Sequence, residues 1–216
     1  MSTPSHGGKF GMRAAGITAL LAVAYVGGQL LEWLGWLGSQ GGPNATSTPL
    51  GIWVLLVPLL LLGPAYIVTI SALHSVASGP AKASSLSALG LAGCYATLTG
   101  FVYIIQLTFV GPRLSSANSA GIELLLFIPY KSFLFAVDLY GYALMCVSAL
   151  FASFALPDGQ AFKHARLFLF LTGLLAPALA LQMFLPQLIW LGALWGFTFP
   201  AAMYFLCLGF AGLKTG

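Results

Sequence analysis

Residues 122–154, IELLLFIPYKSFLFAVDLYGYALMCVSALFASF, decide the fold class, because they are apolar enough to lie in a membrane yet contain Lys131 and Asp138. These two residues are seven positions apart, so on a helix they share one face and are separated along its axis by roughly 10 Å. That distance is too long for an ion pair between the two side chains. A side chain from another helix, a chain of water molecules or a ligand could lie between them. Because ionisable side chains at membrane depth are costly, we interpret this stretch as the centre of a candidate functional site.

The composition of the whole chain points to an integral membrane protein. Of its 216 residues, 59% are hydrophobic and 6% are charged, whereas about a quarter of the residues in soluble domains are charged. Apolar runs long enough to cross a lipid bilayer recur between short polar breaks, and no segment of ordinary soluble-domain size remains. The eight basic residues are scattered singly, so the chain offers no patch for nucleic acid.

The apolar runs predict an all-α fold, a polytopic bundle of six transmembrane helices. The bundle forms a single domain, residues 12–213, after a short cytoplasmic tail, residues 1–11. The first run follows two basic residues as a secretory signal would, but it continues to Leu37 without a small-residue cleavage motif, so we predict a retained helix. The expected helices cover approximately residues 12–37, 50–74, 86–110, 130–156, 167–185 and 188–208.

Prolines and glycines inside these helices predict local features. Pro58 and Pro64 in the second helix and Pro177 in the fifth predict kinks, because proline removes a helical hydrogen bond. Small residues on the third helix would allow a neighbouring helix to approach closely. The glycines concerned are Gly90, Gly93 and Gly100.

The central stretch is longer than one membrane crossing requires, which leaves two arrangements. In the first, it forms one tilted helix. In the second, residues 122–128 lie along the membrane interface and the crossing helix begins at Pro129, a residue that suits a first helical position. We favour the second arrangement, because Lys131 then lies near the interface, where its long side chain can reach water.

The basic residues predict the orientation of the bundle. Cytoplasmic loops of membrane proteins carry an excess of lysine and arginine. Six helices with both termini in the cytoplasm leave only Arg113 in an outer loop and Lys131 near the membrane. Asn44 begins a glycosylation sequon on the outer side, a match that we attribute to chance. The basic residues predicted to be cytoplasmic are Lys9, Arg13, Lys82, Lys163, Arg166 and Lys214.

With this orientation, polar side chains gather in the outer half of the membrane. Residues near helix ends, such as Lys131, Glu32 and Gln187, often only reach the lipid headgroups. Asp138 is deeper and its side chain is short, so it must be neutral, paired or in contact with water. We expect Gln29 and Gln182 at the same level. The candidate ligand-binding residues are Asp138, Lys131, Glu32, Gln106, Tyr103 and Tyr130.

Aromatic side chains are dense around Asp138. Such rings could line a pocket for an apolar or amphiphilic ligand, although packing and lipid contact are their more common roles. The rings belong to Phe127, Tyr130, Phe133, Phe135, Tyr140 and Tyr142.

The chain contains none of the common catalytic or metal-binding motifs. GxSxG, HExxH, P-loop, GxGxxG and CxxC patterns are absent. The three cysteines, Cys94, Cys146 and Cys207, lie singly in apolar segments, and the histidines lie near the predicted cytoplasmic side, which disfavours paired haem ligation. We therefore expect no metal and no cofactor, and an enzyme is less favoured than a binding protein.

Two short segments carry a resemblance. FAVDLYGYALMCVSALFA, residues 135–152, and RAAGI, residues 13–17, resemble segments of uncharacterised bacterial six-helix inner-membrane proteins of unknown function. The resemblance implies a location in the bacterial inner membrane and points to Asp138 and Gly141. It implies no activity.

Three functions remain open. The favoured one is the binding of a small or amphiphilic molecule in an outward-facing pocket, as a transporter or a sensor would require. The second is an accessory subunit, whose partner in a membrane complex or second copy covers the polar face. The third is a small enzyme that modifies lipids within the membrane. A transporter built from inverted repeats would show two related three-helix halves, and the parallels here are weak.

Overall fold

The computed structural model describes residues 6–43, 45–116 and 121–213. The structure is 79% helical, and the described residues form no strand. Six helical segments among them are long and apolar enough to cross a membrane. The prediction of an all-α, six-helix transmembrane bundle is therefore confirmed. Residues 1–5 of the predicted tail and the sequon residue Asn44 lie outside the described residues. From His6 onward the predicted tail is helical.

The first two crossings are α1 (His6–Trp33) and α2 (Pro49–Val76). Thr48 caps α2, because its hydroxyl accepts a hydrogen bond from the Gly51 N–H at 3.1 Å. The same hydroxyl donates to the Leu37 carbonyl at 2.6 Å, which ties the connecting loop to the start of the helix. Helix α2 continues through Pro58 and Pro64 without interruption.

The third crossing contains a π-helical turn that the sequence analysis did not predict. It consists of α3 (Ala81–Ile105), η1 (Gln106–Val110) and α4 (Gly111–Ser115). The Gly111 N–H donates to the Gln106 carbonyl, five residues earlier, which defines the wider turn. Such turns are rare and occur frequently at functional sites.

The central stretch forms a short 3₁₀ turn, η2 (Glu123–Leu125), and then α5 (Phe133–Ala155). Ser132 is the N-cap, and its hydroxyl accepts hydrogen bonds from the backbone N–H groups of Phe135 at 3.2 Å and Ile128 at 3.1 Å. Pro129 lies in the turn before the cap and is not the first helical residue.

The last two crossings are both interrupted. The fifth consists of η3 (Gln160–Phe162), α6 (Lys163–Gly173) and α7 (Ala176–Leu181). Pro177 stands in the first turn of α7, so the proline marks a break between two helices rather than a kink within one. The sixth crossing consists of η4 (Pro186–Leu188), α8 (Ile189–Gly192) and α9 (Trp195–Ala211).

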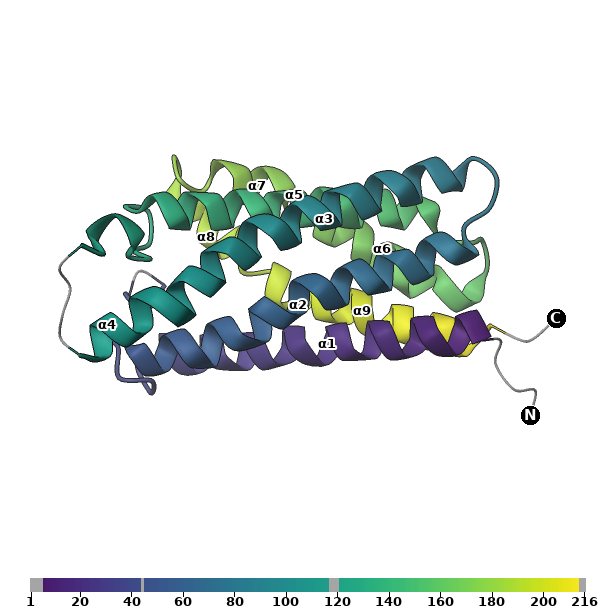
Figure 1. Ribbon diagram of the computed structural model, residues 1–216. Helices are drawn as coiled ribbons and strands as arrows, with labels where there is room; N and C mark the ends of the chain where they lie inside the picture. The colour runs from purple at the N-terminus through teal and green to yellow at the C-terminus, as the bar shows by residue number, and fades with distance from the viewer. Residues whose placement is uncertain (1–5, 44, 117–120, 214–216) are drawn as a thin grey trace.

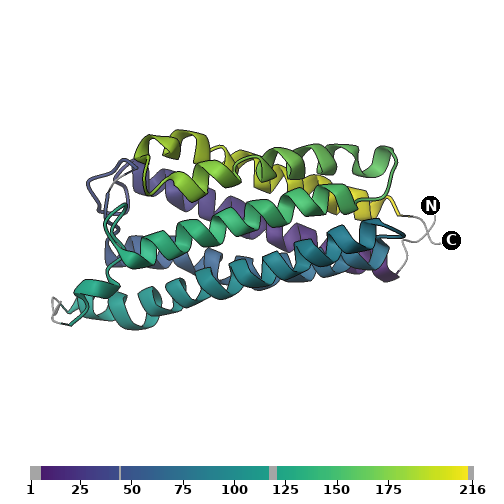
Figure 2. The same cartoon turned by 90° about the horizontal axis from the view of Figure 1, so that it is seen from above.

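The helices run side by side along the long axis of the molecule (Figures 1 and 2). The start of α1 packs against the end of α9, where a Cβ atom added at Gly11 would lie 2.6 Å from the Phe210 ring. Phe162, the last residue of η3, packs on the same ring, with a centroid distance of 5.7 Å. The described ends of α1 and α9 therefore lie at one end of the bundle, together with the connection from α5 to α6.

Close packing occurs at positions other than the glycines expected on the third helix. A Cβ atom added at Gly90, Gly93 or Gly100 would meet no other atom within 4 Å, so these glycines do not mediate a close approach. Another small residue of the third helix, Ala96, does, because a Cβ atom added at Gly63 of α2 would lie 3.2 Å from the Ala96 Cα atom. A further tight contact lies between α6 and α5, where a Cβ atom added at Gly173 would lie 2.9 Å from the Leu150 Cα atom. This contact fixes α6 against α5.

Candidate functional site

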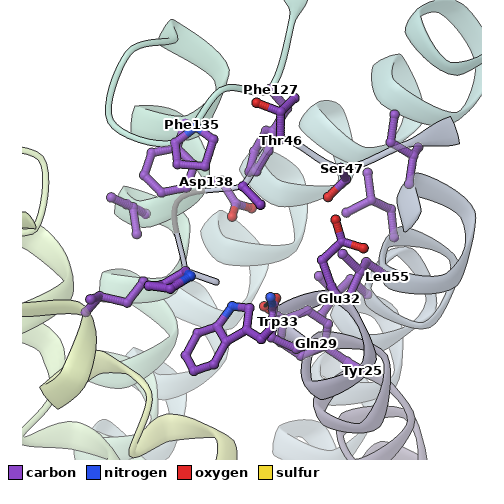
Figure 3. Close-up of a pocket in the computed structure, with 18 of the residues that line it drawn as sticks. Tyr25, Gln29, Glu32, Trp33, Thr46, Ser47, Leu55, Phe127, Phe135 and Asp138 are labelled. Carbon is purple, nitrogen blue, oxygen red and sulfur yellow. Dashed lines mark hydrogen bonds between the residues drawn. The ribbon is translucent and has the colours of Figure 1, made fainter. Parts of the chain in front are cut away.

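A cavity of about 270 Å³ lies in the half of the bundle farther from the described chain ends. Its walls come from the second half of α1, the first halves of α2 and α5, the π-helical turn η1, and the segment from α7 to the start of α9. Figure 3 shows the carboxylates of Glu32 and Asp138 on either side of this space. The same half of the bundle contains the polar side chains that the sequence analysis grouped together.

Helix α1 contributes Tyr25, Gln29 and Glu32, whose spacing of four and three residues places them on one face. The Tyr25 hydroxyl donates to the Gln29 Oε1 atom at 3.1 Å. The Glu32 side chain is only 2% exposed, and neither of its carboxylate oxygens has a hydrogen-bond partner among the described residues. Its Oε2 atom lies against Gly51, 2.8 Å from where a Cβ atom would stand.

Helix α5 contributes Asp138, which is 8% exposed and whose Oδ1 atom has no hydrogen-bond partner in the described part of the chain. The Tyr103 hydroxyl interacts with this carboxylate. It also lies 3.4 Å from the hydroxyl of Tyr142, one helical turn beyond Asp138. Tyr25 and Tyr95 lie close enough to interact with Asp138 electrostatically.

Two glutamines complete the polar lining. Gln106, at the start of the π-helical turn, donates from Nε2 to the Leu125 carbonyl at 2.6 Å, and its Oε1 atom is buried without a partner among the described residues. Gln182 donates from Nε2 to the Tyr130 hydroxyl at 3.0 Å, and its Oε1 atom is likewise unpartnered. Burial raises the pKa of the Tyr130 hydroxyl above its ordinary value, so this group is neutral near pH 7.

The floor of the cavity is aromatic. The Trp195 ring packs edge-to-face with Tyr142 at a centroid distance of 5.1 Å and with Tyr25 at 5.9 Å. The Trp195 ring also stacks on Phe199, with a centroid distance of 5.0 Å. The indole N–H of Trp195 is buried and has no acceptor within the described chain. Aliphatic side chains of α2, including Leu55 and Leu59, form the remaining wall.

Three residues that line the cavity are also exposed at the surface. Leu30 is 55% exposed, and Ala193, between α8 and α9, is exposed as well, and both lie in or between membrane-spanning segments. The third, Thr46, lies in the loop between α1 and α2, at the end of the bundle. The lining of the cavity therefore includes residues of the lipid-facing side and of the end of the bundle.

The structure brings together four of the six predicted site residues. Asp138, Glu32, Gln106 and Tyr103 all line the cavity. The remaining two differ from each other. Tyr130 contacts the site through Gln182. Lys131 is exposed in the turn before α5 and does not line the cavity, so it does not pair with Asp138 there.

The aromatic residues predicted around Asp138 divide in a similar way. Phe127, Phe135 and Tyr142 line the cavity, whereas Phe133 and Tyr140 are 70% and 57% exposed and point away from it. Tyr25 and Trp195 line the cavity but are not among the residues predicted from the sequence. The spacing of Tyr25 to Gln29 and Glu32 was a usable signal, because it places all three on one helical face. Trp195 had no such signal.

Comparison with known proteins identifies no relative: no protein-family model, no curated protein and no solved structure matches the chain. Among the described residues, no three histidine, cysteine or acidic side chains are grouped as metal ligands would be.

Proposed function

We propose that this protein binds a small amphiphilic molecule in the cavity between α1, α2 and α5. Buried polar atoms without partners among the described residues, on side chains that line the cavity, carry the proposal: the Glu32 oxygens, Asp138 Oδ1 and the Gln106 and Gln182 Oε1 atoms. A polar group buried without a hydrogen bond costs about 1–3 kcal/mol, and a charged group costs more. Five such atoms around one space are understandable if a ligand or water satisfies them.

The shape of the cavity supports an amphiphilic ligand. Its walls are mostly apolar, with a few convergent polar groups, which is typical of sites for small molecules. Its exposed lining residues, Leu30 and Ala193 on the lipid side and Thr46 at the end of the bundle, mark two routes by which a ligand could enter. A molecule with an apolar body and a polar head matches both routes, and binding is the step that transport and sensing share.

The distribution of basic residues supports an outward-facing cavity. Lys9 and Arg13 begin α1, Lys82 begins α3, and Lys163 and Arg166 begin α6, all at the end of the bundle opposite the cavity. The positive-inside rule assigns that end to the cytoplasm. The cavity then opens toward the outer face of a bacterial inner membrane, which is the location that the segment resemblance implies.

The proposal is tested by purification from native membranes followed by native mass spectrometry. Leu59 is 3% exposed and lines the cavity, so Leu59→Trp fills part of it. Leu61, on the same helix, is 54% exposed and does not line the cavity, so Leu61→Trp is the matched control. We expect a small molecule in the wild type and in Leu61→Trp but not in Leu59→Trp.

Two results would contradict the proposal. A protein partner that copurifies in place of a small molecule would favour the accessory-subunit function. Bulk phospholipid alone, retained equally by both variants, would show that the cavity has no ligand of its own. Monodisperse elution of Leu59→Trp establishes that the variant is folded.

A further inference from the structure

We propose that the ligand is a small organic ammonium ion, a protonated primary or secondary amine on an apolar body. This inference rests on the proposed function and uses the same cavity. It adds the charge of the ligand and the kind of hydrogen-bonding group that the ligand presents.

The unpartnered atoms around the cavity are almost all acceptors. On the residues that line the cavity they comprise both Glu32 carboxylate oxygens, Asp138 Oδ1 and two glutamine oxygens, against one donor, the indole N–H of Trp195. The buried Tyr95 hydroxyl, which can donate or accept, is also unpartnered among the described residues but does not line the cavity. An ionised carboxylate only accepts hydrogen bonds, and an ammonium group only donates them. A ligand that satisfies this set must therefore bring several N–H or O–H donors, and charge-assisted N–H donors to carboxylates are the strongest of these.

The orientation of Gln106 is fixed by its own hydrogen bond. Its partner is the Leu125 carbonyl, at 2.6 Å, and only the amide nitrogen can donate to a carbonyl. The amide oxygen is consequently the atom left over, buried and without a partner in the described chain. Gln106 thus adds an acceptor to the carboxylates, and it does so from the π-helical turn, where the wider helix shifts the side chain relative to an α-helical register.

The charge of the cavity selects for a cation. Glu32 and Asp138 are two of only four acidic residues in the chain. None of the described residues that line the cavity is a lysine, an arginine or a histidine, and Lys131 is exposed outside it. Because charges interact more strongly where water is scarce, two carboxylates without a basic partner attract a cation and repel an anion.

The walls distinguish an organic cation from a metal ion. A cavity of about 270 Å³ corresponds to the volume of about nine water molecules in the liquid, far more than a bare ion fills. Calcium, for comparison, needs about six to eight oxygen ligands in direct contact, whereas the floor here consists of the Tyr142 and Trp195 rings. Aromatic faces attract ammonium groups and also cover an apolar body, so both halves of the ligand are accommodated.

The inference is tested with three compounds of similar size on the purified protein in lipid nanodiscs. The compounds are 2-phenylethylamine, which is a cation at pH 7, 2-phenylethanol, which is neutral, and phenylacetate, which is an anion. Titration is followed by tryptophan fluorescence, since Trp33 and Trp195 line the cavity. We expect the amine to bind at least about tenfold more tightly than the alcohol, and phenylacetate not to bind.

Variants locate the binding. Glu32→Gln and Asp138→Asn keep the shape of each side chain and remove its charge, and each should weaken amine binding by at least about tenfold. Glu123→Gln is the matched control, because Glu123 is exposed and does not line the cavity, and it should leave the affinity unchanged. The three-compound comparison on the wild type remains decisive if either cavity variant fails to fold.

Three outcomes would overturn the inference. Equal binding of the alcohol or of phenylacetate would show that charge is not selected, while the proposed function would stand. Amine binding that persists in both Glu32→Gln and Asp138→Asn would place the cation elsewhere. Binding of none of the three compounds would reject an ammonium ligand, and the mass spectrometry of copurified molecules then judges the proposed function separately.

Discussion

Replacement of Glu32 by methionine should make the ligand-free protein more stable. Glu32 is 2% exposed, and both of its carboxylate oxygens lack partners among the described residues. Methionine has a similar length, is flexible and needs no hydrogen bond, so it can occupy the same space beside Gly51. The cost that the substitution removes is that of a buried, unsatisfied polar group, about 1–3 kcal/mol. We therefore expect Glu32→Met to raise the free energy of unfolding by about that amount.

The matched control is Gln29→Met, one turn earlier on the same face of α1. Gln29 accepts a hydrogen bond from the Tyr25 hydroxyl at 3.1 Å, so its replacement removes an existing interaction. Side-chain hydrogen bonds between membrane residues contribute about 0.6 kcal/mol on average, and Gln29→Met should lower the free energy of unfolding by roughly that amount. The two variants change the same helix face by a similar volume and should shift stability in opposite directions.

Both variants are measured by SDS-induced unfolding in mixed micelles, with helicity followed by circular dichroism. Ligand must first be removed, because a bound molecule would stabilise the wild type and hide the effect. If Glu32→Met is less stable than the wild type by more than about 1 kcal/mol, then Glu32 is held by a structural interaction. In that case the carboxylate is part of the packing and not a vacant acceptor for a ligand.

Two further predictions concern packing and orientation. Gly173→Ala should lower the free energy of unfolding by about 1–3 kcal/mol, because its Cβ atom would lie 2.9 Å from the Leu150 Cα atom. In the same SDS assay the control Gly93→Ala, whose Cβ atom would meet no atom within 4 Å, should be neutral or slightly stabilising. Equal losses of stability in the two variants would contradict the close packing at Gly173. In a cysteine-free background, a membrane-impermeant thiol reagent added to intact cells should label Gln40→Cys but not Gly159→Cys, and labelling of the second from outside would reverse the proposed orientation.

The sequence predicts the helices better than their interruptions. Hydrophobic length alone identifies six crossings, because each membrane helix must satisfy its own backbone hydrogen bonds. The π-helical turn at Gln106–Val110 has no such signal, since nothing in QLTFV requires a wider turn. Pro177 correctly marks a disturbance in the fifth crossing, but the sequence does not distinguish a kink from the break before Ala176.

The candidate site was predictable in its buried members and not in its exposed ones. Asp138 and Glu32 line the cavity because a short or buried acid cannot face lipid at low cost. Lys131 shares a helical face with Asp138 by spacing, yet the helix begins only at Phe133, so the spacing argument does not apply to it. The acceptor-rich character of the site depends on which atoms hydrogen-bond locally, which no pattern of residue types reveals.

Interruptions in the helices lie around the cavity. This arrangement supports a functional origin for the interruptions and for the cavity. Gln106 and Val110 bound the π-helical turn, and Ala193 lies at the break between α8 and α9; all three line the cavity. Interrupted helices at membrane depth leave backbone groups without helical partners, which is tolerated where they are buried in protein or line a polar space. In the opposite half the 3₁₀ turn η3 lies in a connection between helices, and Tyr66 and Ser148 join α2 to α5 through a hydrogen bond of 3.0 Å. The helix interruptions around the cavity and the unpartnered acceptors lie in one half of the bundle, so the packing of the other half does not depend on the site. Substitutions in the cavity should therefore alter binding more than folding.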